Sequence, residues 1–281
     1  MQSPIRVAAV SYLNTAPLIE GLDACADLEV ERLVPSRIVD RLTQTGPDRV
    51  DLGLVSVIDA ARTGEDLALL SCGMIGCEGP TLTVRLYASI DPARITRLHA
   101  DSDSHTSVAL AQVILHERYG VRPEVVPFNA RECASDGADW PEAALLIGDK
   151  VVASSPPAVR ATTQIDLGSA WHELTGLPFV YALWMCRRES MHDPRIQAGA
   201  ALLDRQRRRN LARLDAIVSQ RAHAKGWPDD LARRYVGELL RYEVGPRERE
   251  AVRVFLHKAS ELGLAPRVEP VWADEPAARV A

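Results

Sequence analysis

Short apolar segments alternate with amphipathic segments from the start of the chain, and this alternation limits the fold more than any other feature. The apolar runs at residues 5–10, 28–34 and 50–56 have the length of buried strands. The segment at residues 35–46 instead repeats its apolar side chains with the period of a helix. Strands that alternate with helices are typical of folds with a largely parallel sheet. We therefore predict an α/β fold.

Two of the predicted strands are longer than the rest, one at residues 81–89 and the other at residues 179–187. If both strands carry the chain between two lobes, residues 1–84 and 180–281 form lobe one and residues 85–179 form lobe two. Ligands of such folds bind in clefts at the carboxyl ends of strands. The strand lengths thus predict a two-lobe architecture with a ligand cleft between the lobes.

Composition and charge narrow the possible partners. The 281 residues carry a formal net charge of -5, which disfavours a nucleic acid as the partner. We find neither a secretory leader nor an apolar run of about 20 residues that would span a membrane, so we expect a cytoplasmic protein. The five cysteines form no CxxC pair, and we expect buried, reduced thiols and no metal site. They are Cys25, Cys72, Cys77, Cys133 and Cys186.

Polar side chains gather where predicted strands are followed by helices. The first amino-terminal turns of helices attract anions, and hydroxyl or amide groups there add hydrogen-bond donors. Any one of these hydroxyls could instead be a helix cap, as we expect for Thr15. Together they predict a neutral, donor-rich anion site. The candidates are Ser11, Asn14, Ser56, Gly79, Thr83, Ser104, His105, Thr106, Ser107 and Asp149.

Motifs of the common enzyme classes are absent from the sequence. The spaced glycines at residues 73–79 lack the pattern of a phosphate loop and predict a turn after a strand at residues 67–72. His105 is a candidate general base, although a position at the start of a helix would also explain it. Asp149 follows an apolar strand and is either a site carboxylate or a helix cap.

Five stretches occur in an order that resembles one family. They are VSYLNTAPLIEGL, EGPTLTV, SDSHTSVALAQVILHERYG, ALLIGDKVV and DLGSAWHELTGLPFVYALW, which together extend from the first strand through Trp184. They resemble the chorismate dehydratases of the futalosine pathway of menaquinone biosynthesis. The resemblance implies a type II periplasmic-binding-protein fold used as an enzyme. It also implies the loss of water from chorismate to give 3-[(1-carboxyvinyl)oxy]benzoate, without a metal or a redox cofactor.

The resemblance also implies roles for single residues. The active-site asparagine of the family falls on Asn14, and its active-site hydroxyl falls on Thr83, where we expect serine. Its anion-binding helix start falls on three hydroxyl residues, with His105 where we expect arginine, and its IGD motif ends at Asp149. Ser11 is a further expected contact with a substrate carboxylate. The three hydroxyl residues are Ser104, Thr106 and Ser107.

Three questions stay open from the sequence. The base is either the enolpyruvyl carboxylate of the substrate or His105. The chain could instead resemble the related dihydroxynaphthoate synthases, or it could be a protein that binds a small anion without turnover. The oligomeric state has no signal in the sequence.

Overall fold

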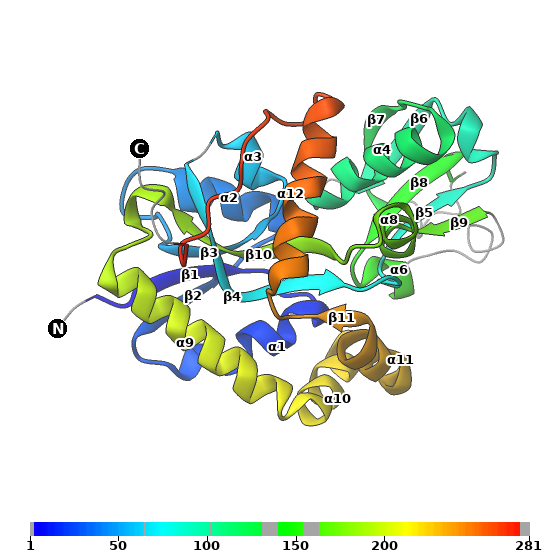
Figure 1. Ribbon diagram of the computed structural model, residues 1–281. Helices are drawn as coiled ribbons and strands as arrows, with labels where there is room; N and C mark the ends of the chain where they lie inside the picture. Colours follow the sequence, from blue (N-terminus) through cyan, green and yellow to red (C-terminus); the bar gives the residue numbers. More distant parts are fainter. Residues whose placement is uncertain (1–2, 65, 102, 131–139, 154–162, 276–281) are drawn as a thin grey trace.

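Two β-sheets form the framework of the computed structural model, which describes residues 3–64, 66–101, 103–130, 140–153 and 163–275 (Figure 1). Sheet one has the strand order β11-β4-β10-β3-β1-β2. Strand β1 pairs in parallel with β2 and β3, whereas β10 pairs antiparallel with β3 and β4. The bounds are β1 Ile5–Ala9, β2 Leu28–Arg32, β3 Leu52–Ser56, β4 Leu67–Cys77, β10 Phe179–Arg187 and β11 Leu240–Arg241.

Sheet two has the strand order β7-β6-β8-β5-β9. Strand β6 is parallel to β7 and β8, and β5 is antiparallel to β8 and β9. The prediction of an α/β fold with two strand-and-helix units is therefore confirmed. The bounds are β5 Val84–Ala88, β6 Arg97–Asp101, β7 Glu124–Phe128, β8 Ala143–Ile147 and β9 Thr163–Asp166.

Helices cover both sheets, and several of them are single turns. The longest of those described is α9, and the described chain after it is mostly helical. The α-helices are α1 Ala16–Ile19, α2 Pro35–Thr43, α3 Asp59–Arg62, α4 His105–Tyr119, α6 Lys150–Ala153, α8 Leu167–Thr175, α9 Pro194–Leu211, α10 Leu214–Ala224, α11 Asp229–Arg233 and α12 Pro246–Glu261. The shorter helical turns are η1 Leu13–Thr15, η2 Leu22–Ala24, η3 Pro92–Arg94, η4 Arg188–Ser190 and the π-helix η5 Arg234–Leu239.

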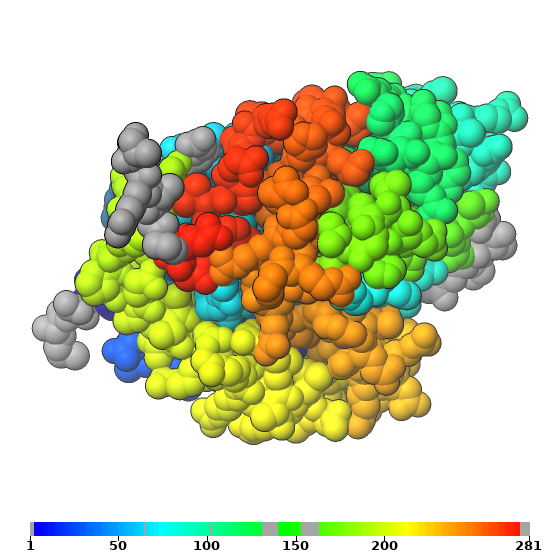
Figure 2. All heavy atoms as spheres, in the orientation of Figure 1, coloured from blue at the N-terminus to red at the C-terminus, as the bar shows by residue number. Residues whose placement is uncertain are grey.

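Helix α12 packs between the two halves of the molecule. It contacts β10 of sheet one and α4 beside sheet two, and it stands between them in Figure 1. Phe255 of α12 meets Trp171 and Phe179 edge to face, with ring centroids 6.0 and 5.0 Å away. In Figure 2 the surface of α12, in orange, runs beside the green surface of the sheet-two half. These three aromatic residues belong to one cluster of buried apolar side chains. Because that cluster includes residues of both sheets, the core is continuous across the molecule.

The structure corrects the predicted strands near residues 67–89. Strand β4 does not end at Cys72 but continues through Cys77, so Gly73 and Gly76 lie inside a strand. A Cβ atom on Gly76 would lie 2.6 Å from the carbonyl oxygen of Phe179, and glycine is therefore needed for the close approach of β10. Residues 81–83 form no strand, and β5 begins only at Val84.

Neither of the two strands predicted to cross between the lobes does so, because β5 lies wholly in sheet two and β10 wholly in sheet one. The other long strand, β4, pairs with β10 inside sheet one. Short segments make the crossings instead, at residues 78–83 and 176–178. Sheet one takes its strands from residues 5–77 and 179–241, and sheet two from residues 84–166. The division into lobes at residues 84/85 and 179/180 stays a prediction.

Candidate functional site

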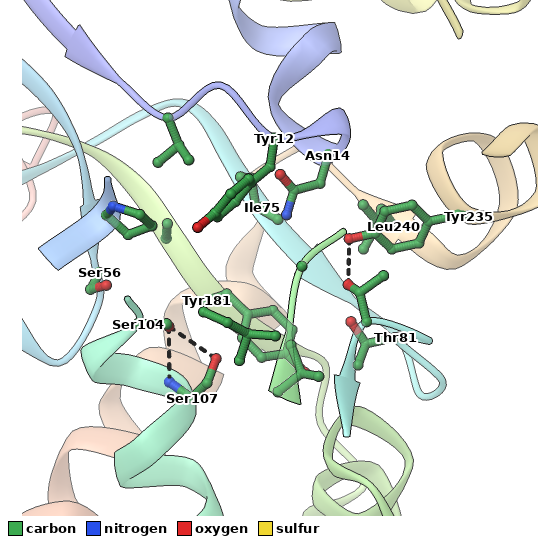
Figure 3. Close-up of a pocket in the computed structure, with 17 residues that line it drawn as sticks. Tyr12, Asn14, Ser56, Ile75, Thr81, Ser104, Ser107, Tyr181, Tyr235 and Leu240 are labelled. Atoms are coloured by element: carbon green, nitrogen blue, oxygen red, sulfur yellow. Dashed lines mark hydrogen bonds between the residues drawn. The ribbon is translucent and has the colours of Figure 1, made fainter. Parts of the chain in front are cut away.

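A cavity lies where the carboxyl ends of β1 and β3 face those of β6 and β8 (Figure 3). Its empty volume is about 560 Å³ when the space at its open mouth is included. It is lined by Val10, Tyr12, Asn14, Pro35, Ser56, Ile75, Thr81, Thr83, Val84, Ser104, Ser107, Ile147, Gly148, Tyr181, Ala182, Tyr235 and Leu240. These described lining residues carry hydroxyl and amide groups but no charged side chain.

Asn14 enters the cavity from the turn that follows β1. The side chain is half-buried and lies near the Tyr235 hydroxyl, and its Oδ1 accepts a hydrogen bond from the Thr15 hydroxyl at 3.3 Å. The expectation that Thr15 caps the next helix is wrong, because its hydroxyl donates to the Tyr12 carbonyl at 3.0 Å and makes no cap bond. Thr15 therefore stabilises the turn that presents Asn14.

Thr83 lies in the crossing segment before β5, opposite Asn14. Its Oγ1 lies 2.5 Å from the hydroxyl oxygen of Tyr235, and both side chains are buried. Leu82, the preceding residue, has a φ of 65°, a conformation that is unusual for a residue with a side chain. The Asp166 carboxylate accepts hydrogen bonds from the amides of Thr81, at 3.0 Å, and Leu82, at 2.8 Å. These bonds hold the backbone that positions Thr83.

The start of α4 presents only some of its polar residues to the cavity. Ser104 caps the helix by accepting a hydrogen bond from the Ser107 amide at 3.2 Å, and it also donates to the Ser107 hydroxyl at 3.0 Å. Successive residues of a helix turn by about 100°, so the two residues between them face elsewhere. His105 Nδ1 lies 2.9 Å from the Asp59 carboxylate, and Thr106 accepts a hydrogen bond from the Ile58 amide.

Five of the ten predicted site residues therefore line the cavity, and the described lining does not include the other five. Exposed Ser11 borders a separate surface depression that also contains Lys225. Gly79 makes the turn after β4 with a φ of 127°. The Asp149 carboxylate accepts a hydrogen bond from the Trp227 indole at 3.1 Å. The five that line it are Asn14, Ser56, Thr83, Ser104 and Ser107.

Three tyrosines of the lining are absent from the set that the sequence predicts. The hydroxyl of Tyr12, in the VSYLN motif, donates to Asp103 at 3.2 Å and so joins the turn after β1 to the sheet-two half. Burial raises the pKa of Tyr181 on β10 and of Tyr235 on η5 well above the usual value, so both keep their protons. Tyr235 has no signal in the sequence, because it lies among charged residues in a segment with a helical pattern.

Asp103, which accepts the hydrogen bond from Tyr12, also belongs to a buried group of ion pairs. The Lys150 ammonium, which is 6% exposed, pairs with the Asp101 and Asp103 carboxylates. Burial raises the pKa of Asp101 above its usual value even though Lys150 favours the ionised form. The group therefore depends on Lys150 to compensate two carboxylates.

Replacing Lys150 by methionine is expected to lower the free energy of unfolding by about 2–3 kcal/mol, because Asp101 then stays buried without its cation. With the cation gone the folded-state pKa of Asp101 rises further. Folding then takes up a proton at pH values above the unfolded pKa, so the variant loses stability as pH rises. Urea unfolding at mildly acid and at neutral pH measures both effects. A variant that is equally destabilised at the two pH values contradicts this account.

Cysteines and acidic residues form no metal site in the part of the chain that the structure describes. Cys72, Cys77 and Cys186 are buried free thiols, and burial raises the pKa of the last two to about 12. Cys25 is partly exposed, and Cys133 lies outside the described residues. Within those residues, helices with the length and apolar character needed to cross a membrane are absent.

Comparison with known proteins identifies the family to which the chain belongs. Over residues 5–261 it matches the model of a family described as menaquinone biosynthesis. The chain belongs to this menaquinone biosynthesis family. The chorismate dehydratase of Thermus thermophilus is 30% identical over 267 residues, which cover 90% of this chain and 93% of that protein. The chorismate dehydratase of Campylobacter jejuni is 25% identical over 256 residues, again 90% of this chain and 93% of the relative.

Solved structures support the fold. A crystal structure of an Archaeoglobus fulgidus protein superposes with a TM-score of 0.70 at 16% identity and covers 93% of this chain and 98% of its own. The alkanesulfonate-binding protein of Xanthomonas axonopodis gives a TM-score of 0.63 at 14% identity, covering 95% and 96%. The fold of this member of the menaquinone biosynthesis family is therefore that of a periplasmic binding protein, as the sequence predicted.

His105 is the candidate base whose position the structure gives. If the chain shares the chorismate dehydratase activity of the two relatives, replacing His105 by glutamine is expected to leave kcat/KM for chorismate within about threefold of wild type, because the ring faces Asp59 rather than the cavity. Ser104→Ala is the companion variant and is expected to raise KM, since it removes a hydroxyl of the lining. Steady-state kinetics of both variants check this. A loss of about 100-fold or more in the His105 variant would restore the histidine as a candidate base.

Proposed function

We propose that this protein is a chorismate dehydratase, which converts chorismate to 3-[(1-carboxyvinyl)oxy]benzoate and water in menaquinone biosynthesis. Membership of the menaquinone biosynthesis family and the two chorismate dehydratase relatives support this activity. The observation that carries the proposal is the meeting of Asn14 and Thr83 in one cavity. These two residues, which the resemblance assigns to the active site, lie far apart in the sequence, yet both lie beside Tyr235, to which Thr83 is hydrogen-bonded.

Hydroxyl groups and the start of a helix bind the substrate in this proposal. Chorismate carries two carboxylates, whereas the described lining of the cavity carries no charged side chain. The partial positive charge at the start of α4, together with Ser104 and Ser107, suits one carboxylate. Ser56, at the end of β3, adds a further hydroxyl to the lining. The donors stabilise the anion without burying a cation.

In this proposal the dehydration depends mainly on hydrogen-bond donors that are held in position. A proton leaves the ring carbon, the negative charge spreads into the ring carboxylate, and the C–O bond of the ring hydroxyl then breaks. Acidic and histidine side chains are absent from the described lining of the cavity, so the enolpyruvyl carboxylate of the substrate takes the ring proton. The departing hydroxide and that proton leave as water, and the ring becomes aromatic. Asn14 and Thr83 donate hydrogen bonds to the developing charge, each contributing ~3 kcal/mol.

Incubation with chorismate tests the proposal. The expected result is a product lighter by one water, with the ultraviolet absorbance of an aromatic ring, formed catalytically. Chorismate that binds but stays intact would instead support a small-anion-binding protein. If chorismate is neither bound nor converted, the proposal is wrong, and the dihydroxynaphthoate synthase reaction is the next one to assay.

A further inference from the structure

Among the described residues that line the cavity, Tyr235 is the polar side chain that hydrogen-bonds to Thr83, one of the two residues assigned to the chemistry, and it also lies near Asn14, the other. Figure 3 shows its ring at the edge of the cavity, with a dashed line from its hydroxyl to the neighbouring threonine. The residue is 1% exposed, and its ring stacks on Trp227 with centroids 5.1 Å apart and planes inclined by 9°. Trp227 in turn donates to Asp149, which holds the indole in place.

The π-helix η5 gives Tyr235 its position. Single π-turns within helices are rare and occur often at functional sites. Here the wide turn covers Arg234–Leu239 and directly follows α11. The backbone of Thr83 is fixed on the opposite side, because its amide donates to the Thr81 carbonyl at 2.7 Å and its carbonyl accepts from the Gly148 amide at 2.8 Å. Both residues of the 2.5 Å hydroxyl contact, Tyr235 and Thr83, are therefore held in place by their backbones.

The direction of this hydrogen bond decides what the contact does. Burial raises the pKa of Tyr235, so the phenol keeps its proton. Its oxygen lies 2.5 Å from Thr83 Oγ1, and either hydroxyl could be the donor. When Tyr235 donates, Thr83 Oγ1 is the acceptor. A hydroxyl that accepts one bond has its own proton free to donate to another partner, and hydrogen bonds in such a chain strengthen one another. The methyl group of threonine further limits the rotation of this hydroxyl.

We infer that Tyr235 is a positioning residue, which donates to Thr83 Oγ1 and so directs the Thr83 proton at the bound substrate. The inference rests on the proposed function for its kinetic test. The leaving hydroxyl of the substrate and the ring carboxylate are the groups that such a proton would meet. Tyr235 thus supplies the orientation, and Thr83 makes the contact.

Tyr242 provides a matched control. It is also a buried tyrosine, seven positions farther along the chain, and burial raises its pKa as well. Its hydroxyl has no hydrogen-bond partner among the described residues. Tyr235→Phe and Tyr242→Phe therefore each remove one buried hydroxyl, but only the first removes a bond to Thr83.

A double-mutant cycle between Tyr235→Phe and Thr83→Val separates positioning from stability. Tyr235→Phe is expected to lower kcat about 10-fold to 30-fold with KM within about threefold, whereas Tyr242→Phe stays within about twofold of wild type. Adding Tyr235→Phe to the Thr83→Val variant should cost no further activity, because the hydroxyl it orients is gone. Losses that add independently, or unchanged activity in Tyr235→Phe, overturn the inference.

A crystal structure of the Tyr235→Phe protein gives a readout that needs no turnover. Thr83 is expected to leave its single χ1 rotamer or to occupy more than one. An unchanged single rotamer overturns the inference, even in an active enzyme. If wild-type protein does not dehydrate chorismate, the proposed function fails alone, and the rotamer of Thr83 still decides the role of Tyr235.

Discussion

Replacing Asn14 by alanine is expected to lower kcat/KM for chorismate about 100-fold to 1,000-fold, the cost of removing one preorganised donor from a site where negative charge develops. Asn14 is the only amide side chain among the described residues that line the cavity. The loss should fall mainly on kcat, because the donor acts on charge that forms only as the ring proton leaves. Steady-state kinetics, followed by the absorbance of the aromatic product, measure it.

A second substitution separates the donor from the shape of the side chain. Asn14→Asp keeps the size of the side chain but replaces the amide donor with a negative charge beside a dianionic substrate. It should therefore be at least as inactive as Asn14→Ala, whereas both proteins should melt close to wild type because Asn14 is only half-buried. Unchanged kcat/KM in the alanine variant removes Asn14 from the mechanism.

Most of what the sequence predicts about the site comes from the hydrophobic periodicity and from the positions where predicted strands end. Residues directly after β1 and β3 and at the start of α4 are recognisable because parallel strands present their carboxyl ends at one edge. The lining of the cavity includes Asn14, Ser56 and Ser104, as that rule predicts. The rule cannot tell which side of a turn or helix each residue faces, and the lining does not include His105 or Ser11.

The remaining differences arise from contacts between distant segments. In the sequence Gly73 and Gly76 suggest a turn. In the structure they lie in β4, where the absence of a side chain allows other segments to approach closely. One of those segments is the partner strand β10, about a hundred residues away in the sequence. Tyr235 reaches the cavity from the π-helix η5, and its hydroxyl contacts Thr83 of the crossing segment. Neither local propensity nor the hydrophobic pattern of a single segment reports such an arrangement. For the same reason the sequence could not show that Asp149 holds Trp227.

Gly168→Ala is expected to have the largest effect on stability, about 3–5 kcal/mol, although the residue lies outside the cavity. It occupies the second position of α8, where a Cβ atom would lie 2.3 Å from the Gly79 carbonyl oxygen and 2.7 Å from the Cys77 sulfur. The first contact is with backbone, so no side-chain rotation can relieve it. Asp166 also ties the start of α8 to the Thr81 and Leu82 amides.

The shift that relieves this clash must move the segment that carries Thr83, so Gly168→Ala is expected to lose activity together with stability. Gly237→Ala is the matched glycine substitution, because its Cβ would lie 3.5 Å from Leu214, an ordinary contact, in a helical segment. It should change the free energy of unfolding by less than about 1 kcal/mol. Urea unfolding of both variants and chorismate turnover in the absence of urea test the account. A Gly168→Ala protein that is as stable as Gly237→Ala and as active as wild type would show that α8 does not fix the position of Thr83.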